Sequence, residues 1–144
     1  MQAIKNINFG SLVIASLAGG WMMYFVDKWF AGFLGLFGLF PGMGSWEWML
    51  GHHVESIIFA IPFAWTAIYN KLPGGGWLKG IIYGILFWLV FPFIVGLIAG
   101  ALGAEPFRQM TAGSAGSFIS VILAHVIYGF FLGALYNPPQ QSAV

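Results

Sequence analysis

The sequence predicts an all-α integral membrane protein with four transmembrane helices in one bundle. Its 144 residues are 60% hydrophobic and only 6% charged, whereas a typical soluble domain carries about 25% charged residues. Four apolar segments approach the length of about 20 residues that a helix needs to cross a bilayer core. Turns rich in glycine, proline and polar residues separate these segments. The lipid bilayer is therefore the expected surroundings of most of the chain.

The whole chain is expected to form a single transmembrane domain. The predicted helices cover residues 9–26, 48–69, 80–102 and 117–136. The first segment also has features of a secretory signal, but we expect it to remain as a helix. Residues 137–144 follow the last helix as a polar, proline-containing tail. With four spans, the two termini are expected on the same side of the membrane.

One apolar segment, residues 29–44, lies between the first two helices and is too short to span a bilayer. We expect a helix lying flat at the membrane interface, and the alternative is a re-entrant lid over the histidines of the second helix. Lysine and arginine beside the helix ends indicate the orientation. Lys5, Lys71 and Lys79 fall on the side of the termini, against Lys28 and Arg108 on the other. This distribution predicts that both termini are cytoplasmic.

The candidate site consists of polar residues within the apolar segments. His52, Glu55 and Ser56 follow one another at spacings of three and four residues, which places them on one face of a helix. His53 is their neighbour, and His125 is expected at a similar depth in the fourth helix. Ionisable groups within a membrane are costly unless they face an interior or a wet cavity. The alternative interpretation is a His52–Glu55 hydrogen bond that only orders the helix.

Small residues indicate where the helices pack closely. Glycines at four-residue spacing let helix backbones approach one another in a membrane, and Pro92 allows a kink because it lacks a backbone N–H. Small residues also follow both His52 and His125 at four-residue spacing, so the first two helices could repeat as the last two. The glycines expected at packing contacts are Gly80, Gly84, Gly96, Gly100, Gly129 and Gly133.

The arrangement of these motifs resembles the YagU-like small bacterial inner-membrane proteins. The resemblance rests on the histidines near the start of the second helix and on two patterns that end at Pro92 and Tyr136. The first pattern is Lys79-Gly80-x-x-x-Gly84-x-x-x-Trp88-x-x-x-Pro92, and the second is His125-x-x-Tyr128-Gly129-x-x-x-Gly133-x-x-Tyr136. The resemblance implies a four-helix fold in the bacterial inner membrane, without an established activity.

Composition and motifs together favour a protein that is not an enzyme. A net charge of +1 and five scattered lysines and arginines argue against nucleic acid as a partner. The absence of cysteine excludes thiolate metal sites and thiol nucleophiles. No serine stands in a recognisable nucleophile motif, and His-x-x-Glu alone is too short a pattern to indicate zinc. We therefore predict no catalytic residue and no metal site.

Three functions remain open. The first is a membrane subunit that packs with protein, lipid or pigment partners in a larger complex, as part of a homo-oligomer or beside other subunits. The second is an electron-transfer subunit that binds haem b, chlorophyll or a quinone through His125 together with His52 or His53. The third is a small proton-coupled carrier or channel with His52, Glu55 and His125 as a relay.

Overall fold

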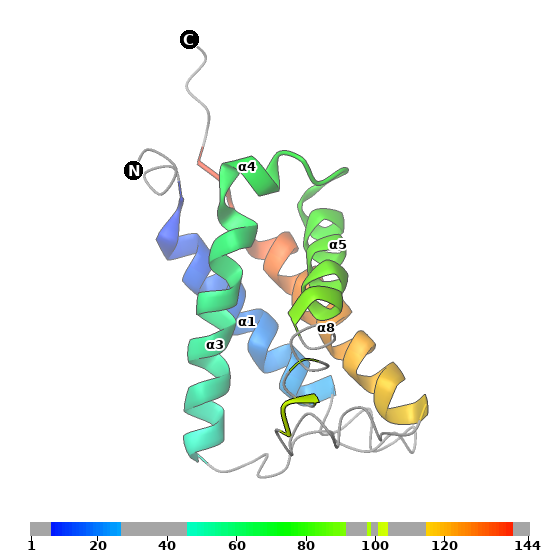
Figure 1. The fold of residues 1–144 in the computed structure, drawn as a ribbon. Helices are drawn as coiled ribbons and strands as arrows, with labels where there is room; N and C mark the ends of the chain where they lie inside the picture. The colour runs from blue at the N-terminus through cyan, green and yellow to red at the C-terminus, as the bar shows by residue number, and fades with distance from the viewer. Residues whose placement is uncertain (1–6, 27–45, 92–97, 99–100, 104–114, 140–144) are drawn as a thin grey trace.

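The structure is a computed structural model that describes most of the helical part of the chain. It describes residues 7–26, 46–91, 98, 101–103 and 115–139. Within these ranges the chain forms five helices and no strand, so the all-α prediction is confirmed for them. The helices are α1 Phe9–Phe25, α3 Trp46–Ala64, α4 Thr66–Tyr69, α5 Gly76–Trp88 and α8 Ala115–Leu135 (Figure 1).

The second predicted helix, residues 48–69, is divided in the structure into α3 and α4. Pro62 lies inside α3 and has no backbone N–H to donate to the preceding turn. Trp65 then adopts an extended conformation, with φ −66° and ψ 120°, between the two helices. Pro62 was not used in predicting the second helix, and it lies two residues before the end of α3.

The third helix, predicted over residues 80–102, begins earlier in the structure, where α5 starts at Gly76. After Trp88 the chain continues as a wider helical turn through Phe91. Pro92, Gly96 and Gly100 lie outside the described residues, and so does the apolar segment 29–44.

The helices run alternately up and down. Figure 1 shows the start of α1, the end of α8 and α4 at one end of the bundle, the arrangement expected for four antiparallel helices. α8 packs on both α5 and α1, and α1 also packs on α3. At the shared end, the Asn8 side chain caps α1 by accepting from the Ser11 N–H at 3.2 Å and donates to the Asn137 carbonyl at 3.1 Å. The first and last helices are thereby tied together.

The closest helix contact lies between α5 and α8. A Cβ atom on Gly80 would overlap the Gly129 carbonyl oxygen, and one on Gly76 would overlap the Gly133 carbonyl oxygen. Likewise, a Cβ on Gly84 would overlap the carbonyl oxygen of His125. The two backbones therefore touch along three helical turns, as small residues allow at such crossings.

The α3–α5 side of the bundle is built from aromatic side chains instead. Phe59 lies 4.8 Å from both Phe87 and Phe91 between ring centroids, and Phe63 lies 5.3 Å from Tyr83. The Tyr83 hydroxyl donates a hydrogen bond across this side to the Phe59 carbonyl. Large rings thus fill the space between two helices whose backbones stay apart.

Many apolar side chains lie on the surface of the bundle as well as in its core, and a few polar groups are buried among the core residues. Ser16, Ser56 and His125 are buried, at 0, 6 and 7% exposure, while Ile14 and Trp46 are 67% and 69% exposed. Large apolar side chains are exposed on α1, α3, α5 and α8 alike. Judged on the described residues, none of the helices combines the length and the mean hydropathy that a membrane span requires.

We expect Gly80→Ala to destabilise the bundle because the new methyl group would overlap the Gly129 carbonyl. Overpacking of this kind costs about 1–3 kcal/mol, which corresponds to a fall in Tm of roughly 5 °C or more. Thermal unfolding in mild detergent, followed by circular dichroism, measures this shift. The matched control is Gly10→Ala, where the nearest atom to the new methyl is 3.8 Å away. Equal Tm values for the two variants would contradict the close α5–α8 contact.

Candidate functional site

His52 lies in the second turn of α3 and faces α1. Its Nε2 is 3.0 Å from the Gly20 carbonyl oxygen, and because a carbonyl only accepts, the imidazole donates through Nε2–H. Gly20 permits this approach, since a Cβ there would lie 2.7 Å from the Ser56 hydroxyl oxygen. The histidine is therefore placed by a glycine on the neighbouring helix.

Ser56 of α3 is hydrogen-bonded to α8 and lies against Gly20 of α1. Its hydroxyl donates to the His52 carbonyl at 2.7 Å, and its own carbonyl accepts a hydrogen bond of 2.5 Å from the Tyr128 hydroxyl of α8. Both Ser56 and Tyr128 are buried. This role of Tyr128 was not predicted from the sequence, where the residue is only part of the motif that ends at Tyr136. The available signal was its position within an apolar segment, away from the helix ends where interfacial tyrosines gather.

His53 faces another part of α1. Its Nδ1 lies 2.7 Å from the Met49 carbonyl oxygen, so Nδ1 carries the proton and donates it. In the neutral imidazole Nε2 then holds a lone pair, and this atom is buried without a hydrogen-bond partner in the part of the chain that the structure describes. The Trp21 ring lies 4.7 Å away between centroids. A histidine held through one ring nitrogen by a backbone carbonyl has the arrangement common among metal-binding histidines.

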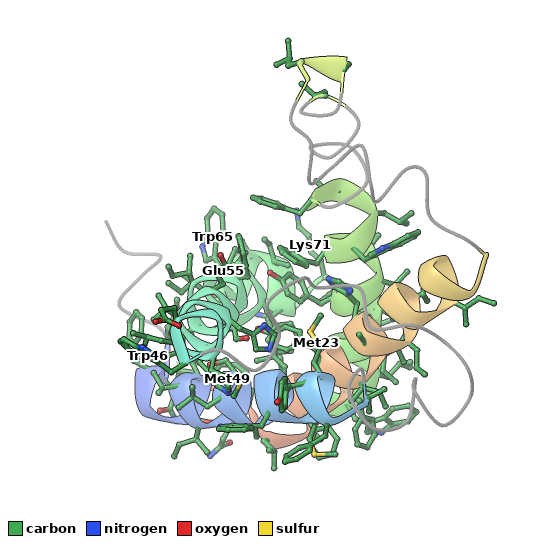
Figure 2. All side chains as sticks on the ribbon, turned by 90° about the horizontal axis from the view of Figure 1, so that it is seen from below. Met23, Trp46, Met49, Glu55, Trp65 and Lys71 are labelled. Carbon is green, nitrogen blue, oxygen red and sulfur yellow. The ribbon has the colours of Figure 1, made fainter. Side chains whose placement is uncertain are left out.

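Glu55 does not join the histidines in the interior. Its side chain is exposed, whereas Ser56 is buried beside it. Figure 2 shows Glu55 and Trp65 on the side of α3 turned away from α1, and Met49 on the side facing α1. The shared polar face predicted from the spacing is therefore divided, with His52 and Ser56 directed inward and Glu55 outward.

His125 is buried on α8 and stacks on Phe87 of α5, with 5.9 Å between ring centroids and 27° between planes. Its backbone meets Gly84. The contacts described here thus place His125 against α5 and place His52 and His53 against α1. Among the described residues, no group of three or more histidine, aspartate or glutamate side chains is positioned to hold a metal ion.

We expect Tyr128→Phe to lower stability by about 0.5–1.5 kcal/mol, the usual net contribution of one intramolecular hydrogen bond, because it removes the bond to Ser56. Equilibrium unfolding in detergent measures the difference. Tyr136→Phe is the matched control, since it removes a tyrosine hydroxyl from the same helix without touching the bond to Ser56 and should cost less. A loss in Tyr136→Phe as large as in Tyr128→Phe would show that the Ser56 bond is not the cause.

Comparisons of the chain with models of protein families, with curated proteins and with solved structures found no match.

Proposed function

We propose that this protein is a non-enzymatic integral membrane subunit that packs with protein, lipid or pigment partners in a larger complex. The observation that carries the proposal is the large number of exposed apolar side chains. Exposed apolar side chains surround the bundle on four helices, while serines, tyrosines and a histidine are buried. Soluble monomers rarely expose contiguous apolar surface of this kind, but hydrocarbon chains solvate it without cost.

The contacts between the helices also support a location in a membrane. Lipid tails are as apolar as leucine, so helices in a bilayer associate through close packing of small residues and through interhelical hydrogen bonds. The bundle uses both, in the Gly80–Gly129 crossing and in the bond from Tyr128 to Ser56. The buried polar groups are thus used to join helices, which favours a packing role over catalysis.

The proposed orientation has both termini in the cytoplasm of a bacterial cell, at the inner membrane. Lys71 and Lys79 lie in the connection after α4 and in the first turn of α5, at the end of the bundle where α1 begins and α8 ends (Figure 1). Positive residues are enriched on the cytoplasmic side of membrane proteins.

Alkaline carbonate extraction of native membranes tests the proposal. An integral protein stays in the pellet with the bilayer, and a peripheral protein is released to the supernatant. We expect the chain to stay in the pellet and, in mild detergent, to elute at a mass greater than its own 15.7 kDa plus the detergent. Release by carbonate would overturn the membrane assignment, and a lone protomer in mild detergent would overturn the assignment as a subunit.

A second candidate function is binding of haem b, chlorophyll or a quinone, and the geometry of His53 favours it. The buried lone pair on Nε2 suits a metal centre or a hydrogen-bond donor. Among quinones, it would accept from the hydroxyl of the reduced form, because the oxidised carbonyl offers no proton. His125 would be the second residue of such a site. The exposed position of Glu55 gives no corresponding support to a proton relay.

If this second function holds, protein from native membranes should carry a visible absorption band or an extractable quinone. His53→Ala should lose at least half of that ligand because the lone pair at Nε2 is removed. Tyr136→Phe should retain it, since that hydroxyl lies at the other end of the bundle, where α8 ends. Colourless, quinone-free wild-type protein would rule the cofactor out, and full retention in His53→Ala would exclude this histidine.

A further inference from the structure

We propose that the connection from α4 to α5, residues 70–75, binds the head groups of anionic phospholipids together with the first turn of α5. This inference rests on the membrane setting proposed above and names the class of lipid that the chain takes as a partner. Figure 1 shows α4 at the end of the bundle where α1 begins and α8 ends. In the proposed orientation, the bound lipids therefore belong to the cytoplasmic leaflet.

The ammonium group of Lys79 is held in a fixed position at this surface. Its Nζ donates to the Tyr69 carbonyl oxygen at 3.0 Å and lies 4.2 Å from the centroid of the Tyr69 ring. An ammonium group has three N–H donors, and the carbonyl accepts from one of them. Neither contact supplies a negative charge, so the other donors suit the oxygen atoms of an anion.

Lys71 places a second cation beside the first. It lies two residues after Tyr69, whose carbonyl accepts from Lys79, and its side chain is exposed. The sequence contains no aspartate or glutamate between Glu55 and Glu105. Lys71 and Lys79 are thus two neighbouring positive charges in a stretch of the chain that provides no carboxylate of its own. This arrangement is complementary in charge to a phosphate group from outside the chain.

Exposed tryptophans at the same end favour a phospholipid over an acidic protein segment. Trp77, in the first turn of α5, is 51% exposed, and Trp65, at the break before α4, is 43% exposed. The Trp77 indole nitrogen lies 3.9 Å from a Cβ position built on Gly75, the N-cap of α5. The polar edge of this ring is therefore directed toward the end of the helix. Tryptophans gather in this way at the level of lipid head groups.

Titration with two lipids, read by native mass spectrometry, tests the proposal on the full chain in mild detergent. Phosphatidylglycerol is the anionic probe, and phosphatidylcholine with the same acyl chains is the control. We expect at least about tenfold tighter binding of phosphatidylglycerol, since each lysine near an anionic surface contributes about fivefold. Equal binding of the two lipids by the wild-type protein would overturn the proposal.

Substitutions of the two lysines locate the site. The double variant Lys71→Gln with Lys79→Gln should lose the preference for phosphatidylglycerol, because both positive charges are removed. The double variant Lys71→Arg with Lys79→Arg should retain it. Lys71→Gln alone, at an exposed side chain, should weaken the preference about fivefold and leaves the Lys79–Tyr69 contact in place. An unchanged preference in both glutamine variants would overturn the proposal.

Glu55→Gln separates the site from the net charge of the protein. This substitution removes a charge on the exposed side of α3, away from both lysines in the sequence, and should leave the lipid preference unchanged. A change in Glu55→Gln as large as that in Lys71→Gln would show that overall charge controls the binding, and it would refute the proposed site.

Two further outcomes distinguish this inference from the proposed function. Wild-type protein that resists carbonate extraction but does not prefer phosphatidylglycerol would refute the inference and leave the membrane assignment intact, whereas release by carbonate would refute both. If the glutamine double variant loses a co-purifying protein and keeps its lipid preference, the lysines bind an acidic protein partner and the lipid site is overturned.

Discussion

The rest of the bundle depends on the backbone contact between α5 and α8. Where Gly80 meets Gly129 and Gly76 meets Gly133, a methyl group on any of these glycines would collide with main-chain atoms. Such a contact fixes the rotation of each helix about its own axis, because only one face of each is smooth enough to fit. The rotation of α8 in turn brings His125 against Phe87 and directs the Tyr128 hydroxyl toward Ser56.

Glycine and aromatic residues have complementary roles around this contact. Glycines bring α5 to α8 and let α1 approach both Tyr128 and Ser56, whereas phenylalanine and tyrosine rings keep α3 and α5 apart while filling the space between them. Tyrosine hydroxyls then connect the separated elements by donating to backbone carbonyls of α3. In surroundings of low dielectric constant such bonds are electrostatically stronger than in water, so a few of them can hold widely spaced helices.

The two helix pairs show a partial correspondence that the small residues after His52 and His125 had suggested. In the first pair, Gly20 of α1 faces His52 and Ser56 of α3, and in the second, Gly84 of α5 faces His125 and Gly129 of α8. The histidines themselves differ, because His52 donates to the Gly20 carbonyl while His125 stacks on an aromatic ring. The two helix pairs thus pack in a similar way, but their histidines lie in different environments.

The sequence by itself determined the helical class, the approximate positions of the helices and most glycines of the α5–α8 contact, because hydropathy and side-chain size act locally along the chain. Gly76, which meets Gly133, was not among the glycines predicted. Only the tertiary structure decided which way each polar residue faces. Side chains three residues apart, such as His52 and Glu55, diverge by about 60° around a helix, so a modest rotation sends one inward and the other outward. That rotation is set by contacts with α1 and α8, which spacing within one helix does not encode. The same holds for Tyr128, whose partner lies 72 residues away.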